Sequence, residues 1–253
     1  MAKWLFILIM GLYSCAVISQ PAAAQSYSKE RWTTHQRLQQ YAQNKFKYQK
    51  WLISAKSYYN GRPGQFPMYT LLEAYINGEH YDPFAQETIE TLYEHAYTAD
   101  TSTDIQDAEE AAANFQSLLE WHLPNFTILK TAIPLVRANP MLGDIKFLEW
   151  MYRQVVARIF KSGTGHSILS AYPIYSIDEE NLIISRANVK IIDTEIINNG
   201  NEYYHIHLTE NVQSGRPGKI YTNMTAIMNH IVTVEKARNP DYTFPLDIPK
   251  DFE

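Results

Sequence analysis

Residues 188–210 read NVKIIDTEIINNGNEYYHIHLTE, and this stretch decides the fold class of the second half of the chain. Two runs rich in β-branched and aromatic residues flank Asn198-Asn199-Gly200, which is a turn signal between strands. The pattern predicts a β-hairpin. Two further β-type runs, HSILSAYPIYSI and KIYTNMT, are set apart by DEENLIISRA and by SGRPG. We therefore expect a small antiparallel sheet.

The residues before this sheet read as a series of helices joined by short breaks. NGRPGQFP interrupts the pattern after the first helix, Asp82-Pro83 is a helix-start signal, and Asp144 and Gly163 bracket the last helix. In the first helix we expect core contacts from Trp32, Leu38, Tyr41, Phe46, Trp51 and Leu52. The prediction is an α+β protein with a helical-hairpin region over 25–161, a β-rich region over 162–238 and an irregular, proline-broken tail over 239–253.

Two resemblances accompany this architecture. Residues 132–155, AIPLVRANPMLGDIKFLEWMYRQV, resemble a tetratricopeptide-type helical hairpin, although a strict internal period is absent. Residues 68–225 resemble a family of exported bacterial proteins that is catalogued as a domain of unknown function. The matching positions are Ser162, Gly163, Gly165, Ser167, Ile174, Ser176, Glu179, Glu180 and Tyr221, and His166 departs from the pattern. This second resemblance implies helices, a small β segment and export, and it carries no catalytic residue.

The N-terminus has the layout of a secretory signal peptide. Lys3 precedes an apolar run, and Ala22-Ala23-Ala24 offers a cleavage site before Gln25, so residues 1–24 are predicted to be removed. An alternative is a lipoprotein in which Cys15 is lipidated. Both interpretations predict an exported protein of the periplasm or cell envelope, with no membrane span after cleavage.

Composition excludes several classes of site and partner. Cys15 is the chain's single cysteine, so the cleaved protein would lack disulfides, a cysteine nucleophile and cysteine-bound zinc. Cleavage would remove one basic residue, which would change the formal net charge from −5 to −6. Because no basic stripe is present, nucleic acid is not an expected partner. The oligomeric state is left open by the sequence.

His205 and His207 are the sharpest candidates for chemistry. Alternate residues of a strand point to the same side, so the two imidazoles share a face and suit zinc or iron. His166 is the candidate third ligand, with Glu202 or Glu210 as candidate carboxylates. The competing interpretation places Tyr204, Ile206 and Leu208 in the core and leaves both histidines facing solvent or a helix. Under that interpretation the protein needs no cofactor.

Other motifs are explained without catalysis. SGTGHS follows a helix and reads as a chain reversal, because phosphate loops precede helix N-termini. Ser167 and Ser170 lack a nucleophile elbow. Asp178-Glu179-Glu180 fits the acidic start of a helix, since the helix dipole favours negative charge there.

Tyrosine is abundant, with 18 in the chain. Its apolar ring and polar tip suit a recognition surface, although tyrosines also pack between helices. The candidate partner-binding residues are Tyr58, Tyr59, Tyr69, Tyr75, Tyr93 and Tyr97. The leading functional hypothesis is a non-catalytic envelope protein that binds a protein or peptide through its helical region. The alternatives are a metal-dependent hydrolase centred on His205 and His207, and a periplasmic immunity or inhibitor protein.

Overall fold

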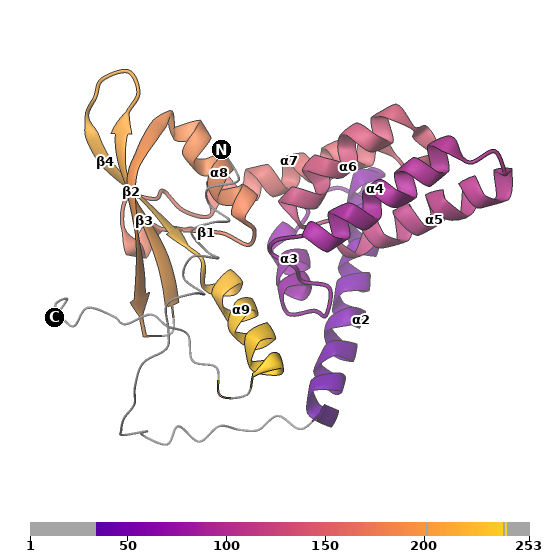
Figure 1. The fold of residues 1–253 in the computed structure, drawn as a ribbon, viewed down its shortest axis with the longest axis horizontal. Coiled ribbons are helices and arrows are strands. Elements are labelled where there is room, and N and C mark those ends of the chain that lie inside the picture. The colour runs from indigo at the N-terminus through magenta and orange to yellow at the C-terminus, as the bar shows by residue number, and fades with distance from the viewer. Residues whose placement is uncertain (1–33, 201, 240, 242–253) are drawn as a thin grey trace. The chain divides into compact units, whose positions relative to one another are not determined.

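The computed structural model describes residues 34–200, 202–239 and 241. Residues from Leu38 onward form one compact unit, and the description below concerns this unit and the beginning of its first helix. The proposed signal peptide, Cys15, Trp32 and most of the proposed C-terminal tail lie outside the described residues, as do the side chains of Leu38 and Tyr41. The helices come first and the sheet follows, so the predicted α+β class is confirmed (Figure 1).

The helices before the sheet are α2 (Thr34–Tyr59), α3 (Met68–Ile76), α4 (Gln86–Thr101), α5 (Ile105–Trp121), α6 (Phe126–Ala138) and α7 (Ile145–Lys161). Side-chain caps start three of them. Asp104 accepts from the backbone N–H of Gln106, and Asp144 accepts from those of Lys146 and Phe147. Asn125 caps α6 in the same way. Each cap satisfies N–H groups that have no partner within the helix and contributes about 1 kcal/mol. The predicted start at Asp144 is confirmed.

The predicted start at Asp82-Pro83 is wrong by several residues. The Asp82 carboxylate accepts from the N–H of Phe84 at 2.9 Å, which closes a tight turn instead of opening the helix. Ala85 then takes the left-handed conformation at φ 56°, and α4 begins at Gln86. Ala85 is fully buried, so packing stabilises a backbone shape that an alanine seldom adopts.

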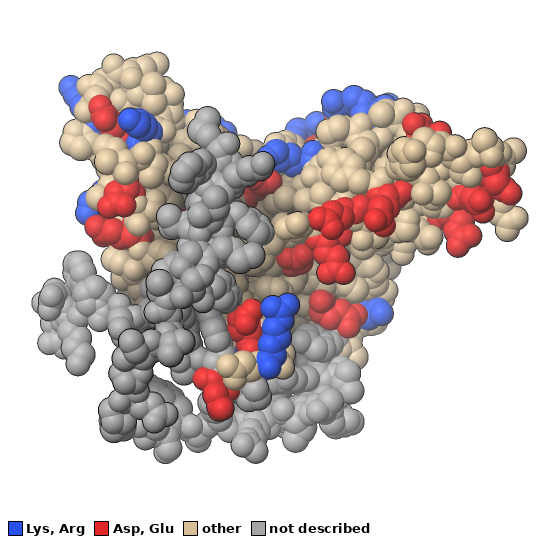
Figure 2. Space-filling model, viewed as in Figure 1, with Lys and Arg blue, Asp and Glu red and all other residues tan. Residues whose placement is uncertain are grey.

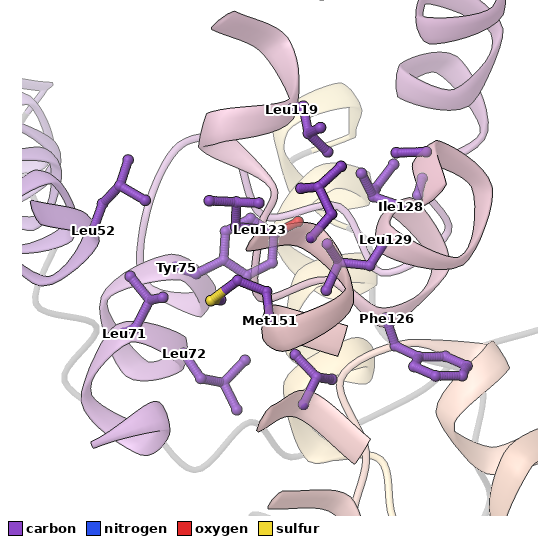
Figure 3. Close-up of a cluster of buried hydrophobic side chains, with 14 of the residues drawn as sticks. Leu52, Leu71, Leu72, Tyr75, Leu119, Leu123, Phe126, Ile128, Leu129 and Met151 are labelled. Carbon is purple, nitrogen blue, oxygen red and sulfur yellow. The ribbon is translucent and has the colours of Figure 1, made fainter. Parts of the chain in front are cut away.

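The core lies among these helices (Figure 3). Its fully buried side chains include Leu71, Leu72, Leu92, Phe115, Leu123, Ile128, Leu129 and Met151. On α2, Tyr48, Leu52 and Ala55 are buried because they recur at helical spacing on one side. Phe46 falls on the other side and is 71% exposed, so its predicted core position is wrong. Trp51 is partly buried against the core.

The sheet contains β1 (Tyr172–Pro173), β2 (Val189–Asn199), β3 (Glu202–Asn211) and β4 (Pro217–Asn223), in the order β1-β4-β3-β2. The β2–β3 hairpin predicted at Asn198-Asn199-Gly200 is confirmed, with Gly200 at φ 74° in the turn. The prediction of a purely antiparallel sheet is wrong at one edge, because β1 pairs parallel to β4. A parallel neighbour is possible there because α8 and the hairpin separate the two strands in sequence.

Two helices complete the fold. DEENLIISRA, predicted as a spacer between strands, lies in α8 (Ile177–Ala187), and α9 (Thr225–Arg238) follows the last strand. α8 contacts α6 and α7, and its first turn reaches across to β3. α9 contacts β3. None of the helices in the described part of the chain combines the length and low charge that crossing a membrane requires.

Candidate metal centre

His205 and His207 lie on the same side of β3, as their spacing predicts. His205 is paired with Ile196 of β2 and Thr222 of β4, and His207 is paired with Thr194 and Ile220. Because β3 has a neighbour on each side, its backbone is held by two ladders of hydrogen bonds. The His207 side chain is 4% exposed and that of His205 is 14% exposed. The pair is therefore packed against its surroundings, His207 more completely than His205.

Glu180 of α8 lies opposite this pair. Its Oε1 atom is 2.8 Å from Nδ1 of His205 and 2.9 Å from Nε2 of His207. The Thr222 hydroxyl donates to the same oxygen at 2.6 Å. Three donors thus converge on one carboxylate oxygen, which carries two lone pairs. Two strands and a helix thus bring one carboxylate oxygen and two imidazole nitrogens within hydrogen-bonding distance, with the Thr222 hydroxyl beside them.

Glu180 is an ionised carboxylate in this arrangement. Burial by itself raises the pKa of the Glu180 carboxyl, but the hydrogen bonds and charges of His205 and His207 outweigh burial and hold that pKa below its usual value. The carboxylate can only accept, so His205 donates from Nδ1 and His207 donates from Nε2. This assigns a proton to each of the two nitrogens that would have to bind a metal.

Thr194 of β2 orients His207 from behind. Its hydroxyl lies 3.0 Å from Nδ1 of His207, on the far side of the ring from Glu180. Hydrogen bonding of the outer ring nitrogen is usual for histidines that ligate a metal, because it sets the tautomer and the direction of the lone pair. With Nε2 bound to a metal, Nδ1 would carry the proton and donate to the same hydroxyl. The contact therefore suits the ring both with and without a metal.

The three side chains fit a metal ion in size and donor type. The ligand atoms of Glu180, His205 and His207 all lie within 4.8 Å of one another. Zinc stands about 2.0–2.1 Å from nitrogen and oxygen ligands, so ligand atoms at the corners of a tetrahedron are about 3.3 Å apart. The two hydrogen-bonded distances, 2.8 and 2.9 Å, need to widen by a few tenths of an ångström. A metal would replace the two shared protons and join the same three groups.

The candidate metal ligands named from the sequence do not all lie together in the structure. It brings His205 and His207 together with a carboxylate, whereas His166, the expected third ligand, is exposed and outside the group. Glu202 instead accepts from the hydroxyl of Tyr204, and Glu210 is also outside the group. Glu180 was attributed to the acidic start of a helix. The signal that could identify Glu180 is the run of three consecutive acidic residues before an apolar helical pattern. If such a helix start is buried, some of these carboxylates must pair with buried basic or hydrogen-bonding side chains.

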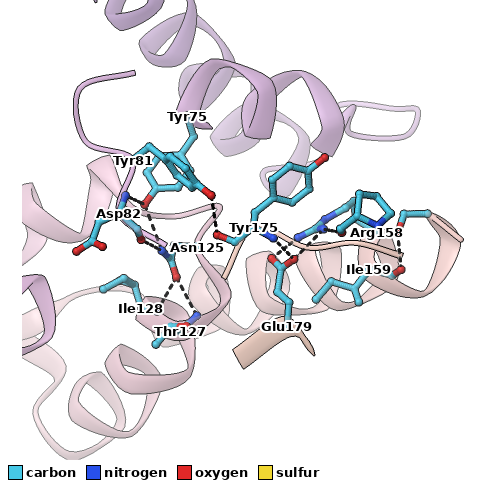
Figure 4. A network of polar contacts seen from close by, with 12 residues as sticks. Tyr75, Tyr81, Asp82, Asn125, Thr127, Ile128, Arg158, Ile159, Tyr175 and Glu179 are labelled. Atoms are coloured by element: carbon cyan, nitrogen blue, oxygen red, sulfur yellow. Dashed lines mark hydrogen bonds and ion pairs between the residues drawn. The ribbon is translucent and has the colours of Figure 1, made fainter. Parts of the chain in front are cut away.

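A second buried polar cluster adjoins the first (Figure 4). Glu179 forms a two-pronged ion pair with Arg158 of α7, and both side chains are 1% exposed. Glu179 also accepts from the backbone N–H of Tyr175 at 3.1 Å, and the Arg158 guanidinium lies 5.0 Å from the centre of the Tyr175 ring. These contacts fix the start of α8, and so they fix the position from which Glu180 reaches β3.

The six candidate tyrosines divide into two groups. Tyr75 is 2% exposed and Tyr58 and Tyr59 are partly buried against the core, so these three help to hold the helices together. The exposed fraction is 50% for Tyr69, 52% for Tyr93 and 71% for Tyr97. Tyr93 and Tyr97 lie one turn apart on α4 and share a surface. The helical region thus keeps part of the aromatic surface that the sequence suggests.

Comparison of the chain with protein-family models, with curated proteins and with solved structures finds no match.

Proposed function

We propose that this is an exported protein that binds a divalent transition metal, preferentially zinc, through Glu180, His205 and His207. The convergence of these three side chains, with Oε1 of Glu180 2.8 and 2.9 Å from the two imidazole nitrogens, carries the proposal. Two imidazoles and one carboxylate are a donor set that zinc and ferrous iron accept. Export is supported by the sequence of residues 1–25, which lie outside the described residues.

Burial supports a site that binds tightly. The exposed fractions of the Glu180 and His207 side chains are 8% and 4%, so little water competes for the metal. Metal binding needs both imidazoles neutral and the carboxylate ionised, so protons compete with the metal for the same three side chains. Affinity should therefore fall as pH is lowered. The metal would also connect α8 to β3, so it should stabilise the folded protein.

A second candidate function, metal-dependent hydrolysis, rests on the number of ligands. Three His, Cys, Asp or Glu side chains converge among the described residues, and a tetrahedral zinc ion would need a fourth ligand. Catalytic zinc sites with two histidines and a glutamate place water in that position. The 14% exposure of the His205 side chain offers a route for water or a small molecule.

The metal proposal is tested on protein made without a histidine tag. Elemental analysis should find one zinc per chain after dialysis, and added zinc should raise Tm while a chelator lowers it. Glu180→Gln, His205→Gln and His207→Gln should each weaken zinc binding at least a hundredfold. His166→Gln is the matched control and should bind as the wild type does, because His166 is exposed and outside the group.

Two results would reject metal binding. One is protein that takes up no zinc, iron, copper or nickel in titration calorimetry. The other is equal zinc binding by the Glu180→Gln and wild-type proteins. Circular dichroism of each variant separates loss of binding from loss of folding. Hydrolysis is addressed only once binding is established, with ester and peptide substrates and with zinc-free protein as the blank.

Export has its own test. Mass spectrometry of the protein from the envelope fraction of an expressing bacterium should give a chain beginning at Gln25. A chain of full length in the cytoplasm would reject export. A lipid mass on Cys15, abolished by Cys15→Ser, would identify the lipoprotein alternative.

A further inference from the structure

An open hollow of about 320 Å³ lies on the helical region, away from the proposed metal centre. Three carboxylates, those of Glu79, Asp82 and Glu87, line it together with His80 and His122. Leu118 adds apolar surface, whereas Tyr81, also in the lining, is 5% exposed. These residues come from the segment between α3 and α4, from α4 itself and from the C-terminal end of α5. The hollow is large enough for an organic group rather than for one water molecule.

The surroundings of the hollow are strongly acidic. The sequence contains no lysine or arginine between Arg62 and Lys130, whereas acidic residues recur through α3, α4 and α5. Figure 2 shows Asp and Glu side chains gathered over α4 and α5 on the visible face. Lys45 lines a smaller hollow that adjoins this one at Glu79 and His80, and it does not line this one. A cation approaching the hollow is therefore attracted over a wide area.

The two histidines do not cancel this charge. Burial lowers the pKa of His122 to about 4, and burial also lowers the pKa of His80. Both rings are therefore neutral at pH 7. The lining residues carry the three negative charges of their carboxylates and no positive charge, so the hollow favours a cation.

The spacing of the groups excludes a simple metal site. Within the described residues, the only group of three or more His, Cys, Asp or Glu ligand atoms within 4.8 Å of one another is the one at Glu180. The carboxylates and imidazoles of the hollow are therefore too dispersed to surround one metal ion. Dispersed carboxylates suit a cation whose charge and volume are spread over several atoms.

The floor of the hollow is held in place by a buried network (Figure 4). The Tyr75 hydroxyl accepts from the amide of Asn125 at 3.2 Å and from the backbone N–H of Asp82 at 3.4 Å. Its own proton is then free to donate to Nδ1 of His122, which lies 3.2 Å away. Asn125 also donates to the backbone carbonyl of Asp82 at 2.9 Å. Asp82 and His122 are thus preorganised, which lowers the entropic cost of binding.

We propose that this hollow binds an organic cation through an ammonium or guanidinium group. The cation is either a free polyamine or the Lys or Arg side chain of a peptide, and both present the same chemistry to Glu79, Asp82 and Glu87. This inference is independent of the metal centre, because it uses none of the same residues.

Titration calorimetry tests the proposal with three probes: spermidine, a tri-arginine peptide amide and calcium chloride, at matched ionic strength. The wild-type protein should bind spermidine, the peptide or both with saturation. Removing one exposed carboxylate should weaken binding about two- to fivefold, so Glu79→Gln/Glu87→Gln should weaken it about tenfold. Glu109→Gln/Glu110→Gln removes the same charge from α5 outside the hollow and should change binding less than twofold.

The arms of the experiment separate the possible outcomes. Saturable binding of spermidine identifies a free amine as sufficient, and binding of the peptide alone identifies the side chain of a polypeptide as the source. Equal weakening in the two double variants would show diffuse charge screening and overturn the proposal. It would also be overturned by calcium binding that displaces the organic cations, or by no saturable binding of any probe to the folded wild-type protein.

Discussion

Glu179 and Glu180 are neighbours in the first turn of α8, yet the Glu179 carboxylate contacts a helix and the Glu180 carboxylate contacts the sheet. Glu179 pairs with Arg158 of α7, and Oε1 of Glu180 lies 2.9 Å from His207 of β3. Successive residues of an α-helix are rotated by about 100°, so two consecutive side chains can reach different neighbours. Buried partners on both sides hold both acids, and the helix start becomes the link between the helical layer and the sheet.

The first prediction concerns the Arg158–Glu179 pair. Arg158→Met should lower the free energy of unfolding by about 3–5 kcal/mol, because it leaves an ionised Glu179 buried without its partner. Arg158→Met/Glu179→Gln should lose less than the single variant, since the double change removes both charges. Urea unfolding measures both. Arg137→Met, in an exposed pair with Glu149, is the control and should cost about 1 kcal/mol or less. A double variant as unstable as Arg158→Met would contradict this account.

The second prediction concerns the residue behind His207. Thr194→Val keeps the shape of the side chain and removes the hydroxyl that lies 3.0 Å from Nδ1. Zinc affinity should fall about 10- to 100-fold, because the ring loses the contact that sets its tautomer and orientation. A competition titration with a zinc-sensitive dye measures the change. Thr233→Val on α9, which removes a hydroxyl bonded to a helix carbonyl, should leave zinc affinity as it is. Wild-type affinity in Thr194→Val would show that the hydroxyl does not orient the ligand.

The third prediction is a pH dependence caused by His122. Burial lowers its pKa in the folded state to about 4, from about 6.5 in the unfolded chain. As pH falls below about 6.5, His122 takes up a proton in the unfolded chain but stays neutral in the folded protein. Stability is therefore fully present above this pH and falls by roughly 3 kcal/mol as pH approaches 4.

Urea unfolding between pH 7.5 and 4.5 checks this sign. His122→Gln should flatten the decline relative to the wild type, while its glutamine oxygen can still accept from Tyr75. His95→Gln, on α4, is the control and should keep the wild-type slope. If His122→Gln loses stability with pH as steeply as the wild type, the decline has another origin.

The fourth prediction compares two glycines with similar backbone angles. Gly165 and Gly200 have φ of +68° and +74°, so alanine costs about 1 kcal/mol at either position for conformational reasons. A Cβ at Gly165 would stand 2.7 Å from the Tyr172 ring, whereas no atom of the residues that the structure describes lies within 4 Å of one at Gly200. Gly165→Ala should therefore have the lower Tm of the two. Equal Tm values would show that the Tyr172 ring moves aside without cost.

Local features of the fold could be predicted because they depend on residues a few positions apart. Asp144 caps α7 through the N–H groups of the next turn, and Asn198-Asn199-Gly200 turns the chain between β2 and β3. The predicted helix start at Asp82 is misplaced because an aspartate that can cap a helix can equally close a tight turn. Here Asp82 closes the turn, and the burial of Ala85 stabilises the left-handed backbone from which α4 then begins. Of α8, the sequence predicts only an acidic helix start at Asp178-Glu179-Glu180, and it does not predict α9, since the short apolar patterns of both segments fit neither period clearly.

The sequence by itself determined the α+β class and the shared side of His205 and His207, because helix and strand periodicities are local properties of the backbone. Tertiary structure alone decided which carboxylate meets the histidines. Glu180 lies 25 residues before His205, and it arrives there because Arg158 anchors α8 against α7 while β3 is held between two strands. The spacing of residues along the chain cannot predict that Glu180 reaches the two histidines, because this contact depends on how α8 packs across the sheet.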